Sequence, residues 1–152
     1  MTHVVAIDQS GRTDETNRNT ALAFANGISH SILIRSVTKQ HCLVALRNRY
    51  KTPHQFYLKL FVVALFILLR DHIKNINTIV IDIEYDGQSG PIRGMLLNYL
   101  RQIVPDYPKE AIIFRSIGKH SSAHYKALGT YLGKQKPDYV VSEEELMKLL
   151  TK

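Results

Sequence analysis

The 152-residue chain has one cysteine, Cys42, and no tryptophan. A single cysteine cannot form an internal disulfide, so the disulfide framework of small secreted domains is excluded. The opening residues MTHVVAID show neither the basic region nor the cleavage site of a signal peptide. These absences predict a protein of the reducing cytoplasm.

The sequence also lacks an apolar run long enough to cross a bilayer, which takes about 20 residues. Its longest such run is residues 60–69, LFVVALFILL, between Lys59 and Arg70. A helix that is this short and apolar on every side is typical of the centre of a water-soluble protein. We therefore expect a core helix here and no membrane partner.

Acidic residues are scarce: 13 Asp and Glu stand against 20 Lys and Arg, which gives a formal net charge of +7. This excess predicts an anionic partner, nucleic acid first and a membrane surface second, although a basic composition can serve solubility alone. With 45% hydrophobic residues, the chain is expected to form a single domain, residues 1–152, around one core.

Hydrophobic periodicity and turn residues predict the order of the elements. Strands are expected at residues 3–8, 20–25, 30–36, 79–86 and 111–114, and helices at residues 53–74, 89–103, 121–132 and 142–150. Asn26-Gly27 is typical of a tight hairpin turn, and residues 37–52 could be a helix or a further strand. The predicted fold is α/β, with a mixed five-stranded sheet and helices on its faces. A right-handed crossover would place the first and fourth strands side by side, and Asp8 near the fourth.

The fourth strand carries an acidic face. Residues 79–86 read IVIDIEYD, so strict alternation places Asp82, Glu84 and Asp86 on one side. Three neighbouring carboxylates repel one another and need a counter-charge when partly desolvated. A divalent metal ion would supply it; a solvated edge strand is the alternative.

Two histidines lie in the C-terminal third of the chain, in GKHSSAHYKA. His120 and His124 are four residues apart and would share one face of a helix. They could ligate a metal, or one could ligate while the other transfers a proton; ordinary surface histidines are the alternative. A zinc site of two histidines and one acid is a weaker candidate, since structural zinc usually takes cysteine.

Basic residues recur around the same predicted helix. Lys119, Lys126 and Lys134 are seven and eight residues apart, which would give a stripe that could border the acids together with Arg115. A solvated helix face would look the same. A second group, Arg47, Arg49, Tyr50 and Lys51, could bind single strands by stacking a base on the tyrosine, or could be a polar loop around a packed tyrosine.

Together these residues resemble the ribonuclease H-like superfamily. That family has an aspartate on its first strand, which Asp8 in AIDQSG matches, and a second acid near the end of its fourth strand. Glu84 matches the second acid best, followed by Asp86 and then Asp82. The family's last ligand lies on the closing helix, where His124 is the candidate. The glutamate that ribonucleases H carry on their long helix is absent, since residues 55–69 contain no acid. The Asp-x-Glu motif of proofreading exonucleases is also absent, because Asp8 is followed by Gln9-Ser10. The resolvase-like branch is therefore most similar.

The resemblance implies a metal-dependent nuclease that hydrolyses DNA. Two Mg²⁺ or Mn²⁺ ions would activate water and stabilise charge on the phosphate, with Asp8 between them. Glu84 or Asp86 would hold one ion and His124 the other. The residues expected to contact nucleic acid are Arg115, Lys119, His120, Lys126 and Lys134.

Several activities remain open within and beside this resemblance. The chain also resembles, overall, small archaeal ribonuclease H-like proteins that degrade single-stranded DNA from 3′ to 5′. A Holliday junction resolvase would require a homodimer to cut two strands symmetrically. A non-catalytic nucleic-acid-binding module is the third possibility. AIDQSGRT also resembles the phosphate loop of actin-like sugar kinases, but those enzymes need two such domains to enclose ATP.

Overall fold

A computed structural model of the chain, which describes residues 3–49 and 53–152, contains one mixed sheet of six strands. The strands are β1 (His3–Ser10), β2 (Thr20–Asn26), β3 (Ile28–Ile34), β4 (Ile76–Ile81), β5 (Ile112–Phe114) and β6 (Tyr139–Val140), in the order β5-β4-β1-β2-β3-β6. The first three form an antiparallel meander. β4 pairs parallel with β1, β5 with β4, and β6 with β3.

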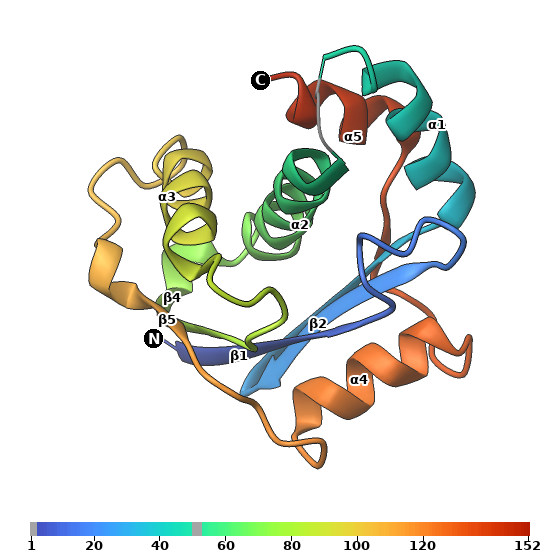
Figure 1. Cartoon of the computed structure of the whole chain (residues 1–152). Coiled ribbons are helices and arrows are strands. Elements are labelled where there is room, and N and C mark those ends of the chain that lie inside the picture. Colours follow the sequence, from blue (N-terminus) through green and yellow to red (C-terminus); the bar gives the residue numbers. More distant parts are fainter. Residues whose placement is uncertain (1–2, 50–52) are drawn as a thin grey trace.

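Five helices cover the sheet: α1 (Ser36–Leu46), α2 (Pro53–Leu69), α3 (Ser89–Leu100), α4 (Ser122–Tyr131) and α5 (Glu143–Leu150). Short 3₁₀ turns lie at Ile73–Asn75 and Lys109–Ala111. Figure 1 shows α1, α2, α3 and α5 on one side of the sheet and α4 on the other. The prediction of an α/β fold with a mixed sheet is confirmed.

The apolar run of residues 60–69 forms the last ten of the 17 residues of α2, and each of its side chains is buried. They join a core with the inward faces of the sheet, α3 and α5. Burial of each large apolar side chain contributes about 1.5–3 kcal/mol. The predicted core helix is therefore confirmed, although it ends at Leu69 rather than near residue 74. In the part of the chain described here, none of the helices combines the length and the apolar character needed to span a bilayer.

Small side chains form the contact between α4 and the sheet. Ala21 and Ala23 of β2 and Ala123 and Ala127 of α4 are all buried. The alternate residues of β2 belong to the core on the α2 side, so the alanines face α4. Since Ala23 pairs with Asp8 across the antiparallel ladder, this close packing brings the beginning of α4 to the end of β1.

Two predictions about the elements need correction, and one open alternative is resolved as a helix. The sheet has six strands rather than five, because the two-residue β6 is too short to show a periodic pattern. Residues 37–52, for which the sequence left a helix or a further strand open, begin with the helix α1. Most important for the site, β4 ends at Ile81, so the acids that follow do not lie on a strand. The predicted stacking residue Tyr50 and its neighbour Lys51 lie outside the described residues.

Candidate metal centre

The register of two parallel strands brings the first pair of acids together. Ile7 of β1 lies level with Ile81 of β4, and the Asp82 N–H donates to the Ile7 carbonyl at 3.2 Å. Asp8 and Asp82 are therefore the residues that follow this pair. Asp8 lies two residues before the end of β1, and Asp82 comes directly after β4. Glu84 comes two residues later. Carboxylate oxygens of Asp8, Asp82 and Glu84 all lie within 4.8 Å of one another; we call these three residues the acidic cluster.

Asp8 is the innermost member, with 5% of its surface exposed. Its Oδ1 accepts from the Gln9 N–H at 2.9 Å, and its Oδ2 lies 2.8 Å from Nδ1 of His124. An ionised carboxylate can only accept, so Nδ1 carries the proton and Nε2 is the ring nitrogen left for a metal or a reacting group. The Oγ of Ser121 caps α4 by accepting from the His124 N–H at 3.0 Å, which fixes the imidazole at the first turn.

The other two acids of the cluster are held in an unfavourable electrostatic setting. Burial raises the pKa of Glu84 to about 7, and the negative charges of Asp82 and Asp8 add to this effect, while Arg12 opposes it. Burial also raises the pKa of Asp82, against a hydrogen bond of 2.7 Å from the Ile117 N–H to its Oδ1. Such shifts at several clustered carboxylates are typical of functional sites.

A divalent cation would relieve this repulsion. Carboxylate oxygens are the ligands that Mg²⁺ and Mn²⁺ prefer, and an imidazole nitrogen is compatible with Mn²⁺. The three carboxylates of the acidic cluster thus offer a donor set suited to these ions, and His124 lies beside it through its bond to Asp8.

The structure brings together Asp8, Glu84 and His124 but not Asp86. Asp86 is exposed, whereas Asp82, which the sequence ranked third, belongs to the cluster. The reason is that alternation stops with β4: the chain turns after Tyr85, which packs on Phe61 in the core, and Gly87 takes a positive φ of 72°. Asp86 is thereby directed to solvent.

The two histidines do not share a helix face. α4 begins after its cap Ser121, so His120 lies in the preceding turn, where its Nδ1 is 3.0 Å from the hydroxyl of Tyr125. The prediction of a histidine pair on one face is therefore wrong. A zinc site of both histidines and one acid is not formed among the described residues, since the one metal-compatible group found there contains neither.

Arg115 and Lys119 lie on the segment that borders the acidic cluster. This segment continues the β4–β5 pairing through the Arg115 N–H, which donates to Ile81, and then contacts Asp82 through Ile117. Both basic side chains are exposed. The segment that carries them thus contacts Asp82, and their binding of nucleic acid stays a prediction.

The expected lysine stripe along one helix is not formed. α4 ends at Tyr131, so only Lys126 of the three lysines lies on it, and Lys134 follows the helix. Nζ of Lys126 lies 3.5 Å from Oδ2 of Asp138, and its side chain is only 22% exposed. Lys126 is therefore already paired, which the spacing of lysines could not reveal.

Tyr125 was not identified from the sequence. It is 53% exposed, its ring packs edge-on against the His124 ring at 5.7 Å, and its hydroxyl bonds to His120. The signal lay in the tyrosine directly after His124, but an exposed aromatic on a helix has no periodic signature. Arg12 was also missed; its Nη1 donates to the Glu84 carbonyl at 2.8 Å.

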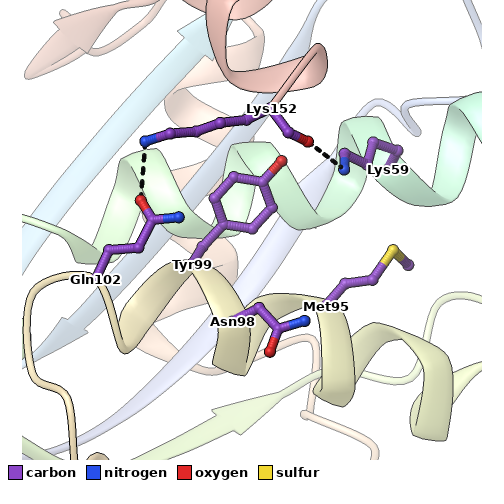
Figure 2. Close-up of a pocket in the computed structure, with 6 residues that line it drawn as sticks. All are labelled: Lys59, Met95, Asn98, Tyr99, Gln102 and Lys152. Carbon is purple, nitrogen blue, oxygen red and sulfur yellow. Dashed lines mark hydrogen bonds between the residues drawn. The ribbon is translucent and has the colours of Figure 1, made fainter.

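A separate hollow of about 150 Å³ lies between α2, α3 and the last residue (Figure 2), and it is lined by Lys59, Met95, Asn98, Tyr99, Gln102 and Lys152. Lys152 donates to Gln102 at 2.9 Å, and the Tyr99 hydroxyl donates to the Leu149 carbonyl at 2.7 Å. These contacts attach α5 to α3. The side chains that line it offer no carboxylate, imidazole or thiol, whereas the acidic cluster offers three carboxylates.

Comparisons of the chain with protein-family models, with curated proteins and with solved structures found no match.

Proposed function

We propose that this protein is a metal-dependent nuclease with a ribonuclease H-like fold that hydrolyses phosphodiester bonds of DNA. The observation that carries the proposal is the convergence of Asp8, Asp82 and Glu84, with His124 bonded to Asp8, at the ends of two parallel strands. An antiparallel meander of β1, β2 and β3, followed by alternating helices and strands with β4 beside β1, supports the element order on which the resemblance rests. The net charge of +7 supports an anionic substrate.

The residues of the site divide the work of hydrolysis. The acidic cluster would hold Mg²⁺ or Mn²⁺, which, when bound, lowers the pKa of water and stabilises charge on the phosphate. Asp8 orients the His124 ring through Nδ1, so that Nε2 can ligate or move a proton. Arg115 and Lys119 would bind the backbone phosphates beside the cluster.

The exposed Tyr125 supports a single-stranded substrate. An aromatic ring next to the reacting site can stack on an unpaired base, which contributes about 1–3 kcal/mol per base. A paired base would not be free to make this contact. The proposed activity is thus removal of nucleotides from single-stranded DNA, in the 3′ to 5′ direction that the resemblance suggests.

The test is cleavage of a 5′-labelled single-stranded oligonucleotide with Mn²⁺, with Mg²⁺ and with a chelator. We expect metal-dependent shortening from the 3′ end, its loss in Asp8→Asn, and its retention in Asp86→Asn, which changes an exposed acid of the loop that carries Glu84. Asparagine keeps the size of the side chain and an acceptor for His124, so the fold should persist. Wild-type cleavage by Asp8→Asn would refute the site.

Two other outcomes would identify the alternatives. Binding without metal-dependent cleavage would indicate a non-catalytic nucleic-acid-binding module. Cleavage of a four-way junction by a dimer, with no shortening of single strands, would indicate a resolvase.

A further inference from the structure

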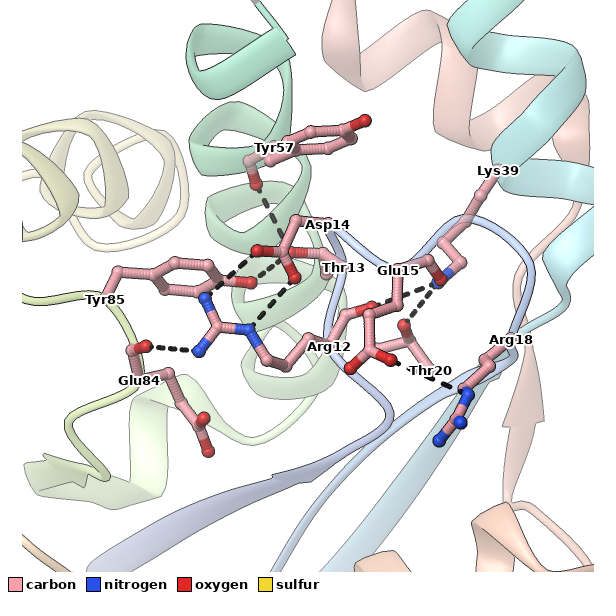
Figure 3. Close-up of polar contacts among 10 residues, drawn as sticks. All are labelled: Arg12, Thr13, Asp14, Glu15, Arg18, Thr20, Lys39, Tyr57, Glu84 and Tyr85. Carbon is pink, nitrogen blue, oxygen red and sulfur yellow. Dashed lines mark hydrogen bonds and ion pairs between the residues drawn. The ribbon is translucent and has the colours of Figure 1, made fainter.

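Arg12 lies next to the acidic cluster and makes three kinds of contact at once (Figure 3). Its Nε and Nη2 bond both carboxylate oxygens of Asp14, each at 3.0 Å, and Nη1 donates to the main-chain carbonyl of Glu84 at 2.8 Å. The guanidinium also lies over the ring of Tyr85, 4.5 Å from its centre. Arg12 therefore holds two consecutive residues of the loop that carries Glu84.

Arg12 is itself held by a buried lysine. Nζ of Lys39, which is fully buried, donates to the carbonyls of Arg12 and Glu15 at 3.2 and 2.8 Å and to the Thr20 hydroxyl at 2.9 Å. Gly11, just before Arg12, has a φ of 77°, and a Cβ there would lie 2.0 Å from the Asn19 carbonyl. The loop between β1 and β2 thus has a well-defined path; we call Arg12, Asp14 and Lys39 the loop network.

Glu84 needs such support because it follows the end of β4. Asp8 is placed by strand pairing, and Asp82 by its hydrogen bond to Ile7 and by Ile117. Glu84 has no strand ladder to hold its main chain, and its carboxylate is repelled by the other two acids. A metal site of fixed geometry requires another element to restrain the loop that carries Glu84. The Arg12 contact to the Glu84 carbonyl does so.

We propose that Arg12 is a positioning residue that holds the Glu84 main chain so that its carboxylate meets Asp8 and Asp82. This inference rests on the proposed metal site and names a residue that determines its affinity. Arg12 acts through Glu84 rather than as a ligand, since a guanidinium has no lone pair to offer a cation. Loss of a supporting contact around metal ligands typically weakens metal affinity by about 10- to 100-fold.

The experiment is titration of the metal-free protein with Mn²⁺ by calorimetry. Arg12→Ala is compared with Arg18→Ala. Arg18 belongs to the same loop as Arg12, and its ion pair with Glu15 is exposed. We expect Mn²⁺ affinity at least about tenfold weaker in Arg12→Ala and unchanged in Arg18→Ala. Arg12→Lys should recover only part of the affinity, because an ammonium cannot form the fork with Asp14 and reach Glu84 together.

Cleavage kinetics distinguish a misplaced Glu84 from a smaller fraction of folded protein. Circular dichroism measures the folded fraction independently. If Arg12 positions Glu84, saturating Mn²⁺ should restore most of kcat in Arg12→Ala, whereas it should not in Glu84→Gln. Equal Mn²⁺ affinity in Arg12→Ala and Arg18→Ala would overturn the inference and leave the proposed function standing. Should Arg12→Ala not fold, wild-type affinity in Arg12→Lys would overturn it equally. Absence of Mn²⁺ binding by the wild type would instead refute the proposed metal site itself.

Discussion

Two polar clusters flank the end of β1, and they differ in the balance of their charges. In the loop network, the carboxylate of Asp14 meets the Arg12 guanidinium, and that hydrogen bond lowers the pKa of Asp14 and raises that of Arg12. In the acidic cluster, burial and mutual repulsion raise the pKa values of Asp82 and Glu84. The same residue types thus shift in opposite directions a short distance apart.

This contrast separates a structural role from a functional one. Charges that satisfy one another stabilise a loop, and removing one partner leaves the other desolvated and unpaired. Charges of one sign that are held together destabilise the fold unless a ligand neutralises them. Arg12 joins the two clusters, because it belongs to the loop network and bonds the main chain of Glu84.

The largest effect should come from breaking the loop network at Lys39. Burial lowers the pKa of this lysine to about 8, yet its ammonium makes three hydrogen bonds. Lys39→Met keeps the length of the side chain but leaves the carbonyls of Arg12 and Glu15 without that donor. We expect the free energy of unfolding to fall by about 2–3 kcal/mol, measured by urea denaturation.

Gln40→Met is the matched control, since this exposed neighbour on α1 donates one bond to the same loop, to the Thr16 carbonyl. It should change stability by less than about 0.5 kcal/mol. Comparable losses in the two variants would show that burial of Lys39 is not what stabilises the loop.

Removing a negative charge from the acidic cluster should instead increase the stability of the metal-free protein. The pKa of Glu84 rises from its usual 4.5 to about 7, so between these pH values the folded protein retains a proton that the unfolded chain has lost. The stability of the metal-free wild type therefore falls as the pH rises from about 4.5 to 7, and the loss persists above pH 7.

Glu84→Gln lacks this loss, so at pH 8 we expect it to unfold at a temperature a few degrees higher than the wild type, on the order of 1 kcal/mol after solvent screening. At pH 4 the two proteins should unfold alike. Asp86→Asn, outside the cluster, serves as the control in the same thermal melts. A lower melting temperature for Glu84→Gln at pH 8 would show that the carboxylate is not electrostatically strained.

The sequence predicted the elements whose formation depends on local pattern. Asn26-Gly27 predicted the hairpin, where Gly27 takes a φ of 79°. The helix expected at residues 142–150 begins after Ser142, whose Oγ accepts from the Glu145 N–H. The placement of Asp8 next to the fourth strand followed from the handedness of crossovers, and the register of β1 and β4 confirms it.

The choice among the three acids could not be made in the same way. Alternation places Asp82, Glu84 and Asp86 on one face only while the strand continues, and the end of a strand depends on its partners. Here β5 supplies only three residues, and Tyr85 is drawn into the core, so the alternation is lost after Ile81. His120 illustrates the same limit, since it lies directly before Ser121, the cap of α4.

The smallest expected effect concerns the salt dependence of substrate binding, and it compares an unpaired lysine with a paired one. Lys119 is exposed beside the acidic cluster, whereas Lys126 already pairs with Asp138. A lysine that contacts a phosphate releases a counterion on binding, so Lys119→Ala should reduce the slope of log affinity against log salt by about one. Anisotropy of a labelled single strand, measured in the Asp8→Asn background to prevent cleavage, gives this slope. Lys126→Ala should leave the slope unchanged, because Asp138 and not a phosphate neutralises that ammonium. A lower slope for Lys126→Ala alone would instead place the nucleic acid along α4 and away from the segment that bonds Asp82.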